Sequence, residues 1–314
     1  MAERRPLLLL VNPSAGRKPA APSSGDPPLE PEQLRDLLAA DLQVTLHELA
    51  EDDDPGELAA GAARGGRDVV VAGGDGTVRP AAAALVGSEV TLGVIPRGSW
   101  NNIATGWGLP RRERDAADVI RRGIERSVDV GLAWHVPAGE GAPDEPPEDA
   151  AAFFEAAGVG LDAAGFGAAA VGTRYGTWRA LVAAWRTLRW RQRRMLLTVD
   201  GKRMRTGAPA VTACNGPYYG FGFALAPQAD PSDGLLDLVV FSGMSTADVL
   251  RHYLAVARNR PRREPRVQHI AARQIRVDGL RRTHPAHADG EPLGLTPVVF
   301  TVRAGALRVF GTGD

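Results

Sequence analysis

The sequence contains a single cysteine, Cys214, among its 314 residues. One cysteine excludes an intramolecular disulfide framework and fits a reducing compartment. The six histidines and this cysteine show no recognisable zinc-ligand spacing, and no internal repeat is evident. We therefore expect a cytoplasmic protein without a zinc site.

The chain also lacks a net charge and a long hydrophobic run. Lys and Arg together number 37, as do Asp and Glu, so the overall charge predicts no nucleic-acid partner. The N-terminal apolar run Leu7 to Val11 ends at Asn12-Pro13, which is too short for a signal peptide or a membrane span. We expect no transmembrane segment.

Short apolar strands alternate with helical stretches from residue 6 to about residue 131. This alternation is the β-α-β pattern of a parallel sheet covered by helices, so the fold class is α/β. We expect a first domain at residues 1–131, to which residues 303–314 return, and a second domain at 132–302. The expected strands of the first domain are 7–11, 44–49, 68–72 and 91–95, and its expected helices are 31–40, 55–64, 80–86 and 114–122.

The second half of the chain has a different residue pattern. It begins with a Pro- and Glu-rich stretch at about residues 136–150 that we interpret as a disordered loop. A hairpin at Asp200-Gly201 and apolar runs at 235–241, 275–277 and 298–302 predict mostly antiparallel β structure. One helix is expected at about 176–194. Its tryptophans and arginines suit either a membrane interface or a helix packed on the second domain with a solvated basic face.

A glycine-rich turn follows an apolar strand at residues 69–77, Val-Val-Val-Ala-Gly-Gly-Asp-Gly-Thr. Gly73, Gly74 and Gly76 let backbone N–H groups approach an anion, and a helix with Pro80 in its first turn places this site at a positive helix N-terminus. Because carboxylate repels phosphate, Asp75 fits the site if Mg²⁺ or an ordered water lies between them. The pattern favours a phosphate site over an ordinary tight turn.

Two further strand ends carry compatible side chains. The expected strand 91–95 is followed by Ser99, Asn101 and Asn102, whose hydroxyl and amides suit phosphate or base edges, or alternatively cap a helix starting near Ile103. The strand 7–11 is followed by small residues, a hydroxyl and two cations at 12–18. Ligands of parallel sheets bind at the carboxyl ends of the strands, so these loops are expected to share one cleft.

Together these motifs resemble the bacterial diacylglycerol kinase catalytic family, which is related to sphingosine and ceramide kinases and more distantly to NAD kinases and phosphofructokinases. The resemblance extends over nearly the whole chain. It implies an N-terminal three-layer α/β nucleotide-binding domain, a second, mostly antiparallel β-sandwich domain, ATP in the cleft, and a lipid hydroxyl as phosphoryl acceptor. The matching segments are 12–16, 73–77, 96–102, 214–220, 226–237 and 289–291.

The resemblance also implies residue roles. Asp289 and Glu291 match a D-G-E signature whose carboxylates activate the acceptor hydroxyl, with Asp75 as a further catalytic residue of the Mg²⁺-ATP site. Both carboxylates address one site if extended geometry continues through Gly290, and the alternative is an exposed Asp-Gly turn. The implied nucleotide contacts are Asn12, Pro13, Ser14, Ala15, Gly16, Gly73, Gly74, Asp75, Gly76, Thr77, Ser99 and Asn102.

Residues 230–237 resemble the family segment that holds a regulatory or structural Mg²⁺ outside the ATP site. Asp230, Asp233 and the Leu235 carbonyl are the implied ligands. Hard oxygen donors suit this cation. The alternative is an Asp-rich turn that leads into the strand 235–241.

The chain departs from the family pattern at two places. Asn102 replaces an aspartate that helps to organise the Mg²⁺ network, and Arg79-Pro80 replaces Asn-Glu after the glycine-rich turn. The second-strand threonine that contacts ATP has only a weak counterpart in Thr45.

We therefore expect a cytoplasmic, peripherally membrane-associated lipid kinase that transfers the ATP γ-phosphoryl group to diacylglycerol and yields phosphatidic acid. A homodimer is compatible with the sequence, which does not fix the oligomeric state. One alternative is a catalytically weakened nucleotide- or lipid-binding regulator, motivated by Asn102. Another is an enzyme similar to NAD kinase.

Overall fold

The structure is a computed structural model that describes residues 5–15, 27–137, 139–141, 143, 145–161, 163, 193–220, 222–257 and 264–313. The chain divides into two compact units, each described by itself below. The first unit comprises Met1–Val130 and Ala304–Asp314, and the second comprises Gly131–Arg303. Two long strands, β5 (Glu125–His135) and β18 (Val298–Phe310), run from one unit into the other.

The first unit is built on a parallel sheet of β1 (Leu7–Val11), β2 (Val44–Glu48), β3 (Asp68–Gly73) and β4 (Thr91–Pro96), in the order β2-β1-β3-β4. The C-terminal part of β18 adds to it in parallel beside β4. Every residue of β1, β3 and β4 is buried, which explains their continuous apolar runs. The parallel α/β organisation expected from the sequence is confirmed.

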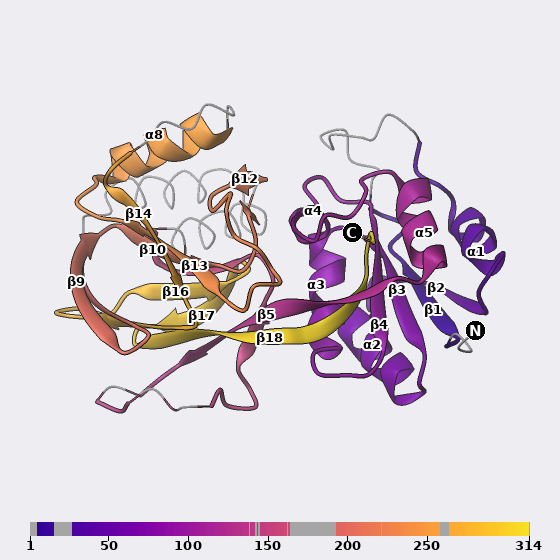
Figure 1. Ribbon diagram of the computed structural model, residues 1–314, viewed down its shortest axis with the longest axis horizontal. Coiled ribbons are helices and arrows are strands. Elements are labelled where there is room, and N and C mark those ends of the chain that lie inside the picture. Colours follow the sequence, from indigo (N-terminus) through magenta and orange to yellow (C-terminus); the bar gives the residue numbers. More distant parts are fainter. Residues whose placement is uncertain are drawn as a thin grey trace. The chain divides into compact units, whose positions relative to one another are not determined.

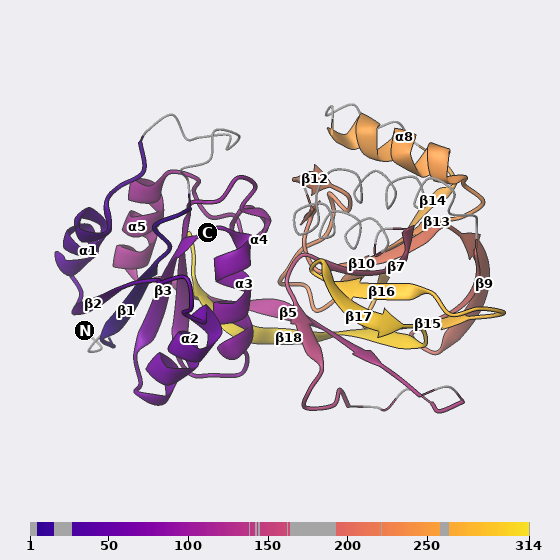
Figure 2. The same cartoon turned by 180° about the vertical axis from the view of Figure 1, so that it is seen from behind.

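Helices cover both faces of this sheet (Figure 1, Figure 2). Helices α1 (Pro31–Ala39) and α5 (Glu113–Arg122) pack on one face, where Leu34, Leu38 and Ile120 meet side chains of β1, β3 and β4. Helices α2 (Pro55–Arg64) and α3 (Asp75–Ala84) lie on the other face, and α4 (Asn102–Gly106) follows β4. The unit therefore has the three layers that were expected.

Helix α3 differs from its prediction in where it begins. It starts at Asp75, with Thr77 and Val78 donating to the Gly74 carbonyl at 2.9 and 3.0 Å, so Pro80 lies inside the helix. The prediction placed the helix start at Pro80 because proline is favoured in a first turn. Within the glycine-rich motif, Gly73 thus ends β3, Gly74 is the N-cap, and residues 75–77 begin the helix.

The second unit consists of two antiparallel sheets whose inner faces form one core. One sheet includes β15 (Gln274–Gly279), β8 (Arg193–Val199), β9 (Lys202–Ala208), β6 (Ala151–Phe153) and the adjoining parts of β5 and β18. The other has the order β14-β13-β10-β7-β16-β17. Its strands are β7 (Ala156–Gly160), β10 (Ala210–Cys214), β13 (Leu236–Phe241), β14 (Val267–Ala272), β16 (Pro285–Ala288) and β17 (Glu291–Leu295).

Buried residues of both sheets, among them Phe153, Leu197, Leu238 and Phe300, pack in one hydrophobic cluster. The mostly antiparallel, sandwich-like fold is therefore confirmed. A separate small hairpin pairs β11 (Tyr218–Tyr219) with β12 (Phe223–Ala224).

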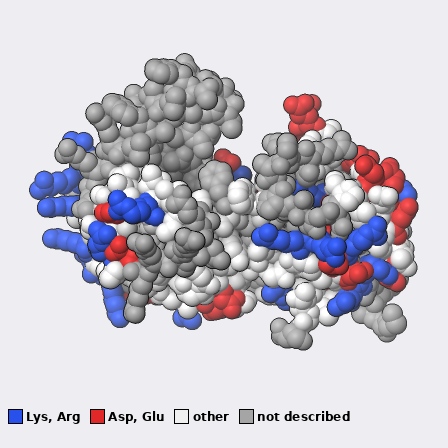
Figure 3. Space-filling model, turned by 90° about the horizontal axis from the view of Figure 1, so that it is seen from above, with Lys and Arg blue, Asp and Glu red and all other residues white. Residues whose placement is uncertain are grey.

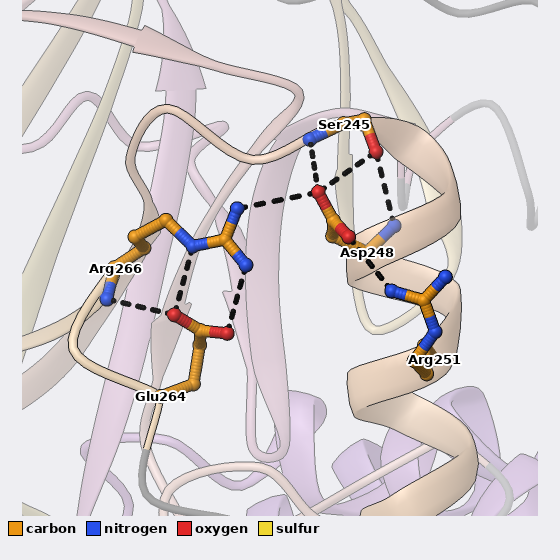
Figure 4. Close-up of polar contacts among 5 residues, drawn as sticks. All are labelled: Ser245, Asp248, Arg251, Glu264 and Arg266. Atoms are coloured by element: carbon orange, nitrogen blue, oxygen red, sulfur yellow. Dashed lines mark hydrogen bonds and ion pairs between the residues drawn. The ribbon is translucent and has the colours of Figure 1, made fainter.

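Helical content of the second unit was predicted less well. The helix expected at about residues 176–194 lies almost wholly outside the described residues, and its predicted end is wrong because Arg193 and Arg194 begin β8. Helix α8 (Thr246–Ala257) was missed. Ser245 and Asp248 cap its start with reciprocal hydrogen bonds, an arrangement shown in Figure 4.

Candidate functional site

Three loops meet at the carboxyl edge of the parallel sheet of the first unit. Register places Val11 beside Ala72, and Gly73 beside Pro96. The loops that follow β1, β3 and β4 are therefore neighbours. Asn12, Pro13, Ser14, Ala15, Gly73, Gly74, Asp75, Gly76, Thr77, Ser99 and Asn102 all lie in these strand ends, loops and helix starts, whereas Gly16 lies outside the described residues.

Asn12 joins the first of these loops to the glycine-rich motif. The side-chain Nδ2 of Asn12 donates to the Thr77 hydroxyl at 3.0 Å, while the side-chain Oδ1 accepts the Ser14 N–H at 3.0 Å. The Asn12 N–H donates to the Ala72 carbonyl at 2.9 Å. The asparagine thus fixes the loop after β1 against the start of α3.

Asp75 joins the glycine-rich motif to the loop after β4. Its carboxylate oxygens accept the backbone N–H groups of Asn102 and Ile103 at 3.0 and 3.1 Å, so it holds the start of α4. Burial raises the pKa of Asp75, and these backbone donors act in the opposite direction. The sequence suggested Asp75 as a metal-network residue, but not its contact with a segment 27 residues further on.

Two glycines permit the close approach of these loops. A Cβ built on Gly74 would lie 2.9 Å from the Gly98 Cα, and one on Gly98 would lie 2.7 Å from the Gly74 Cα. The loop itself is shaped by Asn101, which adopts a φ of 52° and whose side chain accepts the Gly98 N–H and donates to the Gly98 carbonyl. No larger side chain fits where the two backbones meet.

Thr45 does not reach this edge. It is the second residue of β2 and pairs with Leu8, near the opposite end of the sheet. The structure therefore gives no support to Thr45 as the counterpart of the family's ATP-contacting threonine.

In the second unit, Asp289 and Gly290 form the turn between β16 and β17. Both have positive φ angles, 46° and 83°, and Ala288 pairs with Glu291. This is the left-handed geometry of a two-residue hairpin turn. Extended backbone therefore does not continue through Gly290, because an Asp-Gly pair adopts positive φ more readily than other residues. The condition under which Asp289 and Glu291 would both address one site is not met.

The side chain of Asp289 is nevertheless not that of a solvated turn. Its carboxylate accepts the N–H groups of Phe154, Glu155 and Ala156 at 2.7, 2.9 and 3.0 Å, and its own N–H donates to the Ala156 carbonyl at 2.9 Å. Glu291, in contrast, is exposed. The two acids of the signature therefore have different surroundings.

Glu155 connects this turn to residues 214–220, the motif Cys-Asn-Gly-Pro-Tyr-Tyr-Gly. Its carbonyl accepts the Asn215 N–H at 2.9 Å, and its carboxylate accepts the Gly220 N–H at 3.2 Å. Tyr219 contacts His287 through its hydroxyl at 2.9 Å from Nε2. No role for Glu155, Tyr219 or His287 is predicted from the sequence, although Tyr219 lies in the matching segment 214–220.

The residues expected to bind a second Mg²⁺ lie in the loop before β13. Asp230 accepts the N–H and hydroxyl of Ser232 at 3.0 and 2.6 Å, and Asp233 accepts the Leu235 N–H at 2.9 Å. Within the described part of the chain, no group of three His, Cys, Asp or Glu side chains is arranged for a metal. Two exposed carboxylates and a carbonyl suit a cation that keeps several waters, so the donor chemistry fits Mg²⁺.

Two family models match this chain. Residues 6–133 match the model described as diacylglycerol kinase catalytic domain. Residues 156–311 match the model described as YegS C-terminal NAD kinase beta sandwich-like domain.

Related proteins agree with these matches. A diacylglycerol kinase of Mycobacterium tuberculosis (strain ATCC 25618 / H37Rv) is 29% identical over 258 residues, covering 80% of this chain and 79% of that protein. An uncharacterized protein of Synechocystis is 28% identical over 253 residues, covering 77% of this chain but 54% of that protein, so the chain spans about half of that relative. A crystal structure of a Bacillus anthracis diacylglycerol kinase superposes with a TM-score of 0.72 at 19% identity, covering 99% of this chain and 98% of the other, and shows the same fold.

Proposed function

Because this chain belongs to the diacylglycerol kinase catalytic family of lipid kinases, we propose that it transfers the γ-phosphoryl group of ATP to the hydroxyl of diacylglycerol and produces phosphatidic acid. The observation that carries this proposal is the convergence of the loops after β1, β3 and β4, held together through Asn12 and Asp75. Glycine-rich backbone at a helix N-terminus is a general way to bind phosphate.

The nucleotide phosphates would be bound by residues 12–16 and 73–77, with Ser99 as a further contact. Apart from the backbone of α3 itself, no atom of the described residues lies within 4 Å of the position that a Cβ on Gly76 would occupy, so ligand can approach the first turn of α3 there. When bound, Mg²⁺ would neutralise charge on the phosphates. Asp75 would hold the cation, because a carboxylate oxygen that accepts one N–H has capacity for another partner.

Phosphoryl transfer also requires removal of the proton from the acceptor hydroxyl. We assign the base to Glu291, the exposed acid of the signature, and assign to Asp289 the role of holding the turn through its three backbone contacts. Asp75 contributes by holding the loop after β3 against the loop after β4, and through these loops it would position the transferred phosphoryl group.

Radiolabelled ATP and a panel of purified lipids test this function. With Mg²⁺, the wild type should label diacylglycerol, and Glu291→Gln should reduce the labelling by roughly 100-fold or more, within the range expected for loss of a general base. Glu148→Gln removes another exposed carboxylate of the same unit and is the matched control. Failure of the wild type to label any lipid, or undiminished labelling by Glu291→Gln, would contradict the proposal.

A lipid acceptor also requires contact with a membrane surface. Among the described residues, no helix is long and apolar enough to cross a bilayer. Leu250 and Leu254, four residues apart on α8, are each 46% exposed, and we propose that they contact the bilayer interface. Figure 3 shows both signs of charge on each unit, so this proposal does not depend on a uniformly basic surface.

Vesicle sedimentation tests that contact. Leu250→Ser with Leu254→Ser should weaken binding to lipid vesicles, whereas Leu280→Ser, which alters another exposed leucine, should not. Equal binding by both variants would exclude α8 as the contact.

A second candidate function, that of a weakened nucleotide- or lipid-binding regulator, is motivated by Asn102. This residue is only 4% exposed and its N–H binds Asp75. An aspartate there would add a second carboxylate to a buried site, which costs stability unless a cation compensates. Asn102→Asp should raise turnover strongly if the ancestral site has decayed, whereas unchanged or lower turnover favours the enzyme in its present form.

A further inference from the structure

Tyr219, in the motif at residues 214–220, makes two contacts with His287 that the proposed chemistry does not use. The motif begins at the last residue of β10, and Tyr219 in β11 is 4% exposed. The Tyr219 and His287 rings stack with centroids 5.8 Å apart at an angle of 25°. The Tyr219 hydroxyl lies 2.9 Å from His287 Nε2.

His287 lies in β16, two residues before the Asp289-Gly290 turn, and is 1% exposed. A β-bulge between Ala286 and His287 shifts the pairing of β16 with β17, so that His287 opposes Pro292. Bulges change the direction of side chains next to functional turns. Here the other ring nitrogen, Nδ1, accepts the Gly290 N–H at 3.2 Å.

These two contacts favour one tautomer of the imidazole. A nitrogen that accepts an N–H must carry a lone pair, so Nδ1 is unprotonated and the ring proton is on Nε2. The Nε2–H then donates to the Tyr219 hydroxyl oxygen. A doubly protonated ring would direct an N–H group at the Gly290 N–H and lose this contact.

The turn is thereby held at two successive residues. Asp289 is bound by the backbone of residues 154–156, and Gly290 is bound by His287. Glu291 follows immediately as the first residue of β17. Its backbone position depends on both contacts, although neither touches its carboxylate.

We propose that His287, as its neutral Nε2–H tautomer oriented by Tyr219, is a positioning residue that sets the location of the Glu291 carboxylate. This role rests on the proposed function, in which Glu291 takes the proton of the acceptor hydroxyl. Misplacement of a catalytic group by about 1 Å can reduce a rate by roughly 100-fold.

Two substitutions at this position separate the two contacts. In His287→Asn the side-chain oxygen lies near the place of Nδ1 and can accept the Gly290 N–H. In His287→Gln the polar end lies near the place of Nε2 and can reach Tyr219 but not Gly290. We expect His287→Asn to retain kcat within about 3-fold and His287→Gln to lose roughly 10- to 100-fold in kcat, with the KM values for ATP and lipid within about 2-fold of the wild type. Equal kcat values for the wild type and His287→Gln would overturn the proposal.

NMR spectroscopy of the wild type gives a test that needs no activity. The ¹⁵N shifts of His287 should show a proton on Nε2 and none on Nδ1, and the Gly290 amide should exchange slowly with solvent. Tyr219→Phe, which removes only the hydroxyl, should leave the fold intact and loosen the His287 ring. A proton on Nδ1, or rapid exchange at Gly290, would overturn the proposal even if the variants do not fold. If the wild type labels no lipid, the proposed function fails, while these spectra still decide whether the contact exists.

Discussion

The carboxylate of Asp289 accepts the backbone N–H of Phe154 at 2.7 Å, across 135 residues of sequence. With the adjoining N–H groups of Glu155 and Ala156, this contact ties the turn that carries the acidic signature to the segment between β6 and β7. Asp289 therefore has a structural role, and Glu291 is the group that we propose as the catalytic base.

This division of roles predicts different effects of two substitutions. Asp289→Ala leaves three N–H groups without their acceptor, which should lower the free energy of unfolding of the second unit by about 3 kcal/mol, since one unsatisfied buried donor costs roughly 1–3 kcal/mol. Glu291→Gln changes an exposed side chain and should leave the free energy of unfolding within about 0.5 kcal/mol of the wild type. Chemical denaturation of both variants measures the difference. Equal stabilities would contradict the role given to Asp289.

The contact between Gly74 and Gly98 predicts that neither position accepts alanine. Gly98→Ala places a Cβ 2.7 Å from both the Gly74 Cα and the Asn101 Oδ1, so the loops must separate, and the midpoint of thermal unfolding should fall.

Gly76→Ala is the matched control for this effect. Its Cβ has no contact within 4 Å among the described residues other than the backbone of α3, and it lies in a helix, where alanine is favoured over glycine by about 1 kcal/mol. Gly76→Ala should therefore unfold at an equal or higher temperature than the wild type. If it nonetheless binds ATP less tightly, the lost affinity reports backbone approach to the ligand, not packing.

A buried ion pair in the first unit predicts a large effect on stability. Arg97 and Glu113 have side chains 3% and 12% exposed, with Nε and Oε1 2.9 Å apart, and Glu113 also accepts the Leu29 N–H at 2.8 Å. The Arg97 guanidinium additionally donates to the Leu29 carbonyl. Glu113→Ala would leave a buried cation without its partner, and we expect a loss of about 3–5 kcal/mol.

An exposed pair in the same unit provides the control for that measurement. The Arg121 Nη2 and Asp41 Oδ2 atoms are 2.6 Å apart, and the two side chains are 29% and 48% exposed. Asp41→Ala should lower the free energy of unfolding by about 1 kcal/mol or less. Similar decreases in the free energy of unfolding for Glu113→Ala and Asp41→Ala in urea denaturation would contradict the larger contribution expected of the buried pair.

The carboxylates of Asp248 and Glu264 predict a pH dependence of the stability of the fold around α8. Hydrogen bonds from Ser245 lower the pKa of Asp248 to about 2, and the Arg266 side chain lowers the pKa of Glu264 to about 2 (Figure 4). Because these folded-state pKa values lie below the ordinary ones, the stabilisation is complete above about pH 4.5 and is lost as the pH falls toward 2. Carboxyl titrations by NMR should show both midpoints near 2. Midpoints near 4 would contradict the network, and in Asp248→Asn the corresponding titration should disappear.

Local sequence determined much of the first unit. The runs of buried residues in β1, β3 and β4 identify strands covered on both faces, and the glycine, hydroxyl and amide groups that follow these strands predict a phosphate site. The Asp200-Gly201 hairpin between β8 and β9 was predicted for the same reason, because both residues tolerate positive φ. These features depend on a few neighbouring residues, so a linear pattern records them.

Only the tertiary structure decided how the separate motifs act on one another. Asp75 meets Asn102 through a backbone N–H, Asp289 meets Phe154 in the same way, and any residue except proline supplies such a donor, so no side-chain pattern predicts the pair. No individual role for Tyr219 or His287 follows from the sequence, because the two residues come together only when β10 and β16, each paired with β7, lie in the same sheet. The sequence by itself determined which chemistry is present at each strand end and turn. The fold decided which of those groups hold backbone and which remain exposed, because hydrogen bonds between distant segments exist only after the chain has brought them together.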